Sequence, residues 1–156
     1  MNNIKAIIMD VDGTLTDGKL YLTDVGEAFK VFDVKDGLAI KEKLPLMNII
    51  PIIITGRESA ILKKRCEELG ILHLYQGISD KASIIETIIN ELSLPKDSLA
   101  YIGDDDNDLG GMDLAAIIGC PADASTNVKK KADFISSKNG GDGAVREFIE
   151  WLGGNA

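Results

Sequence analysis

The chain has 156 residues, with 25 Asp and Glu against 17 Lys and Arg and a formal net charge of −8. This acidic balance excludes the classes of protein that bind nucleic acids or anionic membranes through cationic side chains. Hydrophobic residues make up 45% of the chain, enough for a buried core, which excludes a disordered or fibrous protein. We therefore expect a single domain over residues 1–156.

Short apolar runs of strand length alternate along the chain with segments of helical periodicity. Most of these runs lack polar alternation, as expected when helices cover both faces of a parallel sheet. In chain order, the predicted strands span residues 4–9, 49–54, 72–75, 99–102, 116–119 and 133–135. The predicted helices span residues 36–44, 58–69, 81–92, 106–115, 125–131 and 143–152. This order predicts an α/β fold with a Rossmann-like open parallel sheet and helices on both faces.

One segment interrupts the alternation after the first predicted strand. Two strand-like runs, 19–23 and 28–32, flank the turn-forming residues 24–27. This pattern is typical of a β-hairpin, which we expect over residues 19–32. Since the hairpin has no place in a parallel sheet, it should project from it.

No segment has the pattern of an export signal or a membrane span. Only the short apolar run Ala6–Met9 precedes the first aspartate, which is too little for a secretory signal. The longest uncharged run, 44–56, contains two prolines and is shorter than the roughly 20 residues that span a bilayer. Cys66 and Cys120 have neither metal-ligand spacing nor the density of a disulfide scaffold. We expect two buried thiols in a cytoplasmic protein.

Acidic clusters follow two of the predicted strands. Asp10 and Asp12 come after the first strand, and Asp104, Asp105 and Asp108 come after strand 99–102. The carboxyl ends of parallel strands lie at one edge of a sheet, where ligands bind. Two carboxylates about 4 Å apart repel by about 4 kcal/mol at an effective dielectric near 20, so convergence requires a counter-charge. Helix caps could explain a single aspartate but not both clusters, and the oxygen-rich set favours Mg²⁺.

Groups suited to phosphate follow the strand 49–54 and begin the helix 81–92. Thr55 and Gly56 offer a hydroxyl and a backbone N–H next to Arg57, just before a helix, which is a natural phosphate cradle. Lys81 stands at a helix N-terminus, where a cation opposes the helix dipole unless an anion lies nearby. Together with the acidic clusters, these residues predict a phosphoryl-transfer site.

These motifs, residues 10–18, 55–57, Lys81 and 103–105, resemble in order and spacing the four signature motifs of the haloacid dehalogenase superfamily of phosphohydrolases. Further segments resemble the sugar-acid phosphatases of that superfamily, namely residues 65–70, 73–77 and 140–147. The resemblance implies a Mg²⁺-dependent phosphatase of a phosphorylated keto sugar acid with eight or nine carbons. The segment 106–112 departs from the pattern and leaves the substrate partly open.

The resemblance also implies roles for the acidic residues. Asp10 would attack phosphorus and form an aspartyl phosphate, and Asp12 would protonate the leaving alkoxide and then accept a proton from water. The Asp10 carboxylate, the Asp12 backbone carbonyl and Asp104 would hold Mg²⁺. Asp105 and Asp108 would hold these ligands in place without binding the metal themselves.

Cationic and backbone groups would bind the substrate. Thr55, the backbone at Gly56 and Lys81 would contact the phosphoryl oxygens and stabilise charge in the transition state. Arg57 lies beside this cradle and is a candidate for substrate binding. Arg65 is a second candidate as a planar donor for a sugar carboxylate, although Glu68, three residues on, could equally be its partner on the helix.

The sequence leaves little room for a cap domain, which superfamily members often carry after the first or second motif. Residues 18–54 hold only the hairpin, one helix and one strand. The resemblance implies a homotetramer in which projecting hairpins assemble, and a neighbouring subunit would then cover the open site. Two other functions stay open: a phosphatase of a nonulosonate 9-phosphate, and a non-catalytic oligomerisation module like those fused to sugar-acid cytidylyltransferases.

Overall fold

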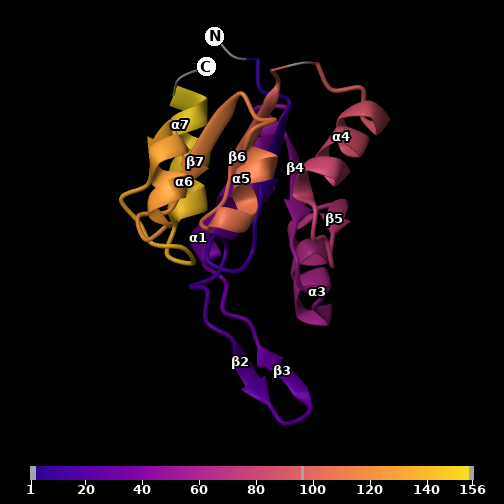
Figure 1. Cartoon of the computed structure of the whole chain (residues 1–156), viewed down its shortest axis with the longest axis vertical. Coiled ribbons are helices and arrows are strands. Elements are labelled where there is room, and N and C mark those ends of the chain that lie inside the picture. The colour runs from indigo at the N-terminus through magenta and orange to yellow at the C-terminus, as the bar shows by residue number, and fades with distance from the viewer. Residues whose placement is uncertain (1–2, 96, 155–156) are drawn as a thin grey trace.

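A six-stranded parallel sheet forms the centre of the structure, a computed structural model that describes residues 3–95 and 97–154 (Figure 1). The spatial order is β5-β4-β1-β6-β7-β8, and every neighbouring pair is parallel. The strands are β1 (Ala6–Met9), β4 (Ile50–Ile54), β5 (His73–Tyr75), β6 (Leu99–Ile102), β7 (Ile117–Cys120) and β8 (Phe134–Ile135). The predicted α/β fold with an open parallel sheet is confirmed.

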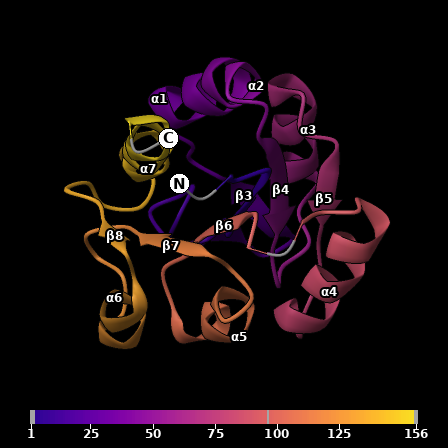
Figure 2. The same ribbon diagram turned by 90° about the horizontal axis from the view of Figure 1, so that it is seen from above.

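Helices cover both faces of this sheet (Figure 2). One face carries α1 (Val34–Leu38), α2 (Leu44–Leu46), α3 (Ala60–Leu69) and α7 (Ala144–Gly154), and the other carries α4 (Lys81–Glu91), α5 (Leu109–Met112) and α6 (Thr126–Lys131). Successive residues of β1 alternate between the two cores, with Ile7 and Met9 in one and Ala6 and Ile8 in the other. Because β1 is buried on both faces, it holds the residue that follows it at the centre of the sheet edge.

The helical segment before β4 is longer than predicted and contains an irregular turn. It begins at Val34, where Asp33 caps the first turn, and a π-helical turn, η1 (Ala39–Lys43), joins α1 to α2. The prediction of a helix over 106–115 was wrong in extent. The structure has a 3₁₀ turn, η2 (Asp106–Asp108), with a capping box formed by Asp105 and Asp108, followed by the short α5 (Leu109–Met112).

The hairpin consists of β2 (Tyr21–Thr23) and β3 (Gly26–Phe29) and projects from the body at the lower end in Figure 1. The rings of Tyr21 and Phe29 stack across it at 4.6 Å between centroids. Its tip is tighter than the predicted loop 24–27, since Gly26, with φ of 127°, already pairs with Thr23. Several apolar side chains of this segment are exposed, among them Leu20, Leu22, Val25 (91%), Phe29 and Val31.

Cys66 and Cys120 are free and buried, as predicted, and burial raises the pKa of each thiol to about 11. Within residues 3–95 and 97–154, no helix is long and apolar enough to cross a membrane. The elements between residues 18 and 54, where no cap domain was expected, are the hairpin, the α1–α2 segment and β4. That residues 1–156 form one domain stays a prediction.

Candidate active site

The carboxyl ends of β1, β4 and β6 bring the predicted site residues to one edge of the sheet. Met9 at the end of β1 is paired with Ile53 of β4 and with Ile102 of β6. The residues that follow these three strands therefore lie at about the same position along the strand direction. The backbone N–H of Asp10 donates to the carbonyl of Ile102 at 3.0 Å. This strand register is the reason that motifs distant in sequence converge.

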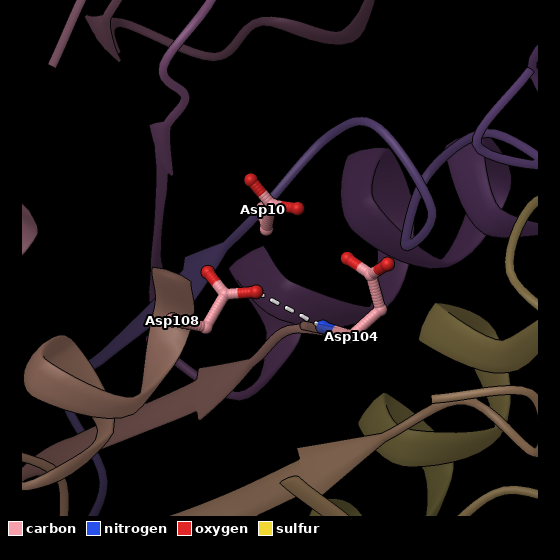
Figure 3. A group of neighbouring side chains, drawn as sticks. All are labelled: Asp10, Asp104 and Asp108. Carbon is pink, nitrogen blue, oxygen red and sulfur yellow. Dashed lines mark hydrogen bonds between the residues drawn. The ribbon is translucent and has the colours of Figure 1, made fainter. Parts of the chain in front are cut away.

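Three carboxylates from these ends face one another (Figure 3). Asp10 follows β1, while Asp104 and Asp108 follow β6, and each offers an oxygen within 4.8 Å of the others. Asp10 and Asp108 are buried and Asp104 is half-buried. Oxygen donors are the ligands that Mg²⁺ prefers. The group contains Asp108, which was predicted as a support, and not Asp12, so the ligand set of Asp10, Asp12 and Asp104 stays a prediction.

Lys81, the first residue of α4, lies between two of these carboxylates. Its Nζ is 2.7 Å from Asp10 Oδ1 and 2.7 Å from Asp108 Oδ1, and the residue is 3% exposed. With all groups ionised, three carboxylates against one ammonium leave two negative charges in excess. A divalent cation balances this excess, so the residues present fit Mg²⁺ in charge as well as in donor type.

The pKa values in this group reflect the crowding of negative charge. Burial, followed by contact with Asp10, raises the pKa of Asp104 from 3.8 to about 8. Burial and the charge of Asp108 also raise the pKa of Asp10, although Lys81 acts in the opposite direction. Burial alone would lower the pKa of Lys81, but Asp10 and Asp108 outweigh it and raise that pKa. Asp104 therefore favours either a proton or a cation at neutral pH.

Asp108 and Asp105, both predicted as supports, have different surroundings. Asp108 accepts hydrogen bonds from the Tyr101 hydroxyl at 2.7 Å and from the backbone N–H groups of Asp104 and Asp105 at 3.0 and 3.3 Å. Lys81 Nζ is a further donor to Asp108. The Asp108 carboxylate therefore holds Lys81, Tyr101 and the backbone after β6 in place. Asp105 is exposed and caps η2 by accepting from the N–H of Asp106 at 2.8 Å.

The loop after β1 passes very close to the acidic group. Gly13 has φ of 96°, and a Cβ at this position would overlap Oδ2 of Asp104, so glycine is required on both counts. The Thr14 hydroxyl donates to Asp104 Oδ1 at 3.2 Å. Gly13 and Thr14, in the motif 10–18, therefore position Asp104, in the motif 103–105.

Asp12 is partly buried and pairs with a lysine that the sequence did not single out. Lys30 Nζ lies 2.7 Å from Asp12 Oδ1 and 2.9 Å from Glu27 Oε1. Burial alone would lower the pKa of Lys30, but its hydrogen bonds to Asp12 and Glu27 outweigh this and raise that pKa. Lys30 was missed because the contact depends on how the hairpin folds back, for which periodicity gives no signal.

The predicted phosphate cradle lies at the end of β4, beside the acidic group in the sheet order. Thr55 is buried, and its backbone bonds to the carbonyl of Tyr75 and the N–H of Ile78 at 3.0 and 3.1 Å. Gly56 and Arg57 are exposed at this edge. The structure thus holds the Thr55 backbone rigidly and leaves the next two residues open to a ligand.

Arg65 lies apart from this cluster. Its guanidinium packs over Gly37, with its central carbon 5.7 Å from the centre of the Phe32 ring, and is 3.4 Å from Glu68 Oε2. A Cβ at Gly37 would overlap the guanidinium. The structure therefore does not bring Arg65 together with Asp10, and a substrate-binding role for it stays a prediction.

The segment 138–143 supports the loop after β1 from the other side. Gly141 N–H donates to the carbonyl of Thr14 at 3.1 Å, and Gly140 N–H donates to Asp123 Oδ1 at 3.0 Å. A Cβ at Gly140 would overlap the carbonyl oxygen of Gly13. The sequence marked these glycines only through their resemblance to other phosphatases, and their contact explains why two adjacent glycines are needed.

Comparisons with known proteins agree with this geometry. Residues 67–149 match the family of haloacid dehalogenase-like hydrolases. The chain is 40% identical over 150 residues to 3-deoxy-D-manno-octulosonate 8-phosphate phosphatase KdsC of Salmonella typhi, covering 96% of this chain and 79% of that relative. The corresponding protein of Yersinia pestis is 41% identical over 150 residues, covering 96% and 80%.

Solved structures give the same result. The cobalt-bound deoxy-D-mannose-octulosonate 8-phosphate phosphatase of Haemophilus influenzae superposes with a TM-score of 0.92 at 38% identity, covering 97% of this chain and 88% of that one. The phosphatase of Moraxella catarrhalis, solved with magnesium, phosphate and KDO, superposes with a TM-score of 0.91 at 38% identity. That match covers 97% of this chain and 86% of the other.

Proposed function

Because the chain belongs to the haloacid dehalogenase-like hydrolases, we propose that it hydrolyses 3-deoxy-D-manno-octulosonate 8-phosphate. It is a phosphatase with Mg²⁺ as its cofactor. The substrate is supported by relatives of that name at about 40% identity along most of the chain, and by the neighbour that holds magnesium, phosphate and KDO.

The observation that carries the proposal is the arrangement of Lys81 between Asp10 and Asp108, with Asp104 beside them. A non-catalytic module would have no reason to keep a buried ammonium at 2.7 Å from two carboxylates, since removing charges from water is costly. The same groups provide a nucleophile, a metal site and a phosphate-binding cation. The arrangement therefore favours the enzyme over the oligomerisation module.

In the first step, a carboxylate oxygen of Asp10 attacks phosphorus and the bond from phosphorus to the sugar oxygen breaks. Asp12 gives a proton to that oxygen, so the sugar leaves as a neutral alcohol and Asp10 carries the phosphoryl group. The partly buried position of Asp12, two residues beyond Asp10, supports this role. In the second step, water attacks phosphorus and gives a proton to Asp12, the bond from phosphorus to the Asp10 oxygen breaks, and phosphate leaves with the Asp10 carboxylate regenerated.

Charge on the phosphoryl oxygens is balanced by groups that this edge of the sheet presents. Thr55, the backbone of Gly56 and Lys81 bind these oxygens, and Arg57 contacts the substrate from the exposed edge. The Asp10 carboxylate, the Asp12 carbonyl and Asp104 would hold Mg²⁺, and Asp108 and Asp105 would support this loop. When bound, the ion would supply positive charge that neutralises part of the negative charge of the phosphate and the carboxylates.

We further propose a homotetramer in which hairpins of neighbouring subunits assemble and cover the open site. The exposed apolar side chains of the hairpin support this, because a row of such side chains is typical of an interface. Arg65 contacts substrate in this proposal as a donor to its carboxylate. A cytoplasmic location completes the proposal, and cell fractionation checks it.

The deciding experiment measures phosphate release from 3-deoxy-D-manno-octulosonate 8-phosphate and from a nonulosonate 9-phosphate, each with and without Mg²⁺. We expect a higher kcat/KM for the octulosonate and no turnover without the metal. A higher value for the nonulosonate would move the function to that substrate. Turnover of neither substrate by a chain with a native circular dichroism spectrum would reject both and favour the module.

A further inference from the structure

Lys30 is half-buried between two exposed apolar residues, Phe29 and Val31. Most of the residue's exposed surface is backbone, because its side chain is only 5% exposed. Lysine is almost never buried without partners, because its ammonium loses hydration. Several apolar residues of the hairpin are thus exposed while the ammonium of Lys30 is withdrawn from water, the reverse of what a hairpin on the surface of a protein normally shows.

The partners of Lys30 connect the hairpin to Asp12. Its Nζ bonds to Asp12 Oδ1 at 2.7 Å and to Glu27 Oε1 at 2.9 Å. The side chain of Asp12 is 21% exposed and that of Glu27 is 18% exposed, so water screens this contact less than it would a surface pair. Lys30 thereby fixes one oxygen of the carboxylate that the proposed mechanism uses to move protons.

A second set of contacts holds Glu27 in place. The Ser59 hydroxyl donates to Glu27 Oε2 at 2.6 Å, and the Ser59 N–H donates to Gln76 Oε1 at 2.7 Å. Ser59 also caps α3 by accepting from the N–H of Leu62 at 3.2 Å. Glu27 follows the turn residue Gly26, so a residue near the hairpin tip is attached to the N-terminus of α3, and through Glu27 this helix helps to determine where Lys30 lies.

We propose that Lys30 is a positioning residue that orients the Asp12 carboxylate, and that Glu27 and Ser59 hold Lys30 for this purpose. The inference rests on the proposed function, because it assigns Lys30 to the same reaction. It gives the hairpin a role within its own subunit, separate from contacts with other subunits. Lys30 acts through Asp12 and does not itself touch phosphorus.

The test compares Lys30→Met with the unaltered full chain in saturating Mg²⁺. We measure kcat and KM for 3-deoxy-D-manno-octulosonate 8-phosphate, and the single-turnover release of nitrophenolate from 4-nitrophenyl phosphate. Losing a group that orients a catalytic residue lowers activity by about 10- to 100-fold. We expect a fall of this size in kcat for the sugar-acid phosphate, with little change in KM. Nitrophenolate release should fall far less, because that leaving group needs no proton.

Three further variants make the result specific. Lys30→Arg should recover part of kcat, since it keeps a cation that can reach Asp12. Glu27→Gln should show a smaller loss with the same dependence on the leaving group, and it serves as the test if Lys30→Met fails to fold. Lys35→Met changes an exposed lysine on α1 and should leave both rates unaltered.

The outcomes separate this inference from the proposed function. If the unaltered chain hydrolyses the sugar-acid phosphate and Lys30→Met does so equally well, the positioning role is wrong and the proposed function stands. A rise in KM alone would make Lys30 a substrate-binding cation, and equal losses on both esters would make it a structural residue. If the unaltered chain hydrolyses only other phosphate esters, the proposed substrate fails, and the leaving-group comparison on those esters still decides the role of Lys30.

Discussion

The buried carboxyl group of Asp36 makes the free energy of unfolding depend on pH in an unusual direction. Asp36 is 1% exposed, and its Oδ1 accepts from the N–H of Arg146 at the start of α7 at 2.8 Å. Among the described residues, its Oδ2 has no hydrogen-bond partner. Burial is the main cause that raises the pKa of Asp36 from 3.8 to about 6.

The size of the effect follows from this pKa. A change of about two units corresponds to about 3 kcal/mol of free energy of unfolding. Because the pKa is higher in the folded state than in the unfolded state, the contribution of Asp36 is complete below pH 3.8 and is lost as the pH rises through about 6. Above that pH, the ionised carboxylate destabilises the fold relative to the protonated form.

The substitution Asp36→Asn tests this because it keeps an oxygen for the Arg146 N–H and removes the ionisation. Urea unfolding of both proteins at about pH 4 and about pH 8 gives the difference in unfolding free energy at each pH. We expect this difference to shift in favour of the variant by about 2 to 3 kcal/mol between the two values. Other carboxylates are common to both proteins and cancel.

The matched control is Asp24→Asn, the same chemical change at the exposed tip of the hairpin. A difference for Asp36→Asn that stays constant, within about 0.5 kcal/mol, would show that Asp36 is ionised at no cost in the folded state. The argument from burial would then be refuted. Both variants must unfold in a single transition for the comparison to hold.

The remaining predictions concern the site itself. Asp10→Asn should abolish turnover while the circular dichroism spectrum stays native, and activity above a few per cent in a deamidation-free preparation would contradict its role as nucleophile. Lys81→Ala should lower kcat/KM for sugar-acid and small phosphate esters alike, by about 10²- to 10³-fold, and a loss confined to one ester would remove it from the phosphate site. Chelation of Mg²⁺ should stop phosphate release, and added Mg²⁺ should raise the melting temperature, as scanning calorimetry checks; an unchanged melting temperature would argue against the site at Asp10 and Asp104. Charging the exposed apolar hairpin positions Leu20 and Leu22 should dissociate the tetramer in light-scattering measurements and lower kcat/KM more for the sugar-acid phosphate than for the small ester, whereas a monomer with unaltered sugar-acid turnover would reject the subunit cover.

The part of the site that sequence predicts well is the part that strands position. Asp10, Thr55 and Asp104 each lie directly beyond the end of a parallel strand, and the topology of such a sheet sends all three to one edge. Lys81 was found because a cation at a helix N-terminus needs an anion, and the structure supplies Asp10 and Asp108. Element ends are less certain, as the 3₁₀ turn before α5 illustrates.

The residues that sequence misses are those whose partners depend on how separate elements pack. Lys30 meets Asp12 in a hairpin that folds back and bonds through Glu27 to the N-terminus of α3. Asp36 meets α7 because helices from opposite ends of the chain lie together. The same limit applies to Arg65: helical periodicity gives the stripe on which it lies but not the neighbour that this stripe meets. The structure supplies Phe32 and Gly37 as those neighbours.

The contact of Gly140 and Gly141 with the loop after β1 has a consequence for synthesis of the protein on the ribosome. The loop after β1 is among the first segments to leave the ribosome, yet the carbonyl of Thr14 is paired with the N–H of Gly141, near the other end of the chain. The strands on both sides of β1 also come later, because β4 and β6 follow the hairpin. A nascent chain therefore carries Asp10 at an edge of the sheet that is not yet assembled, and this edge is completed only after residue 141 has left the ribosome.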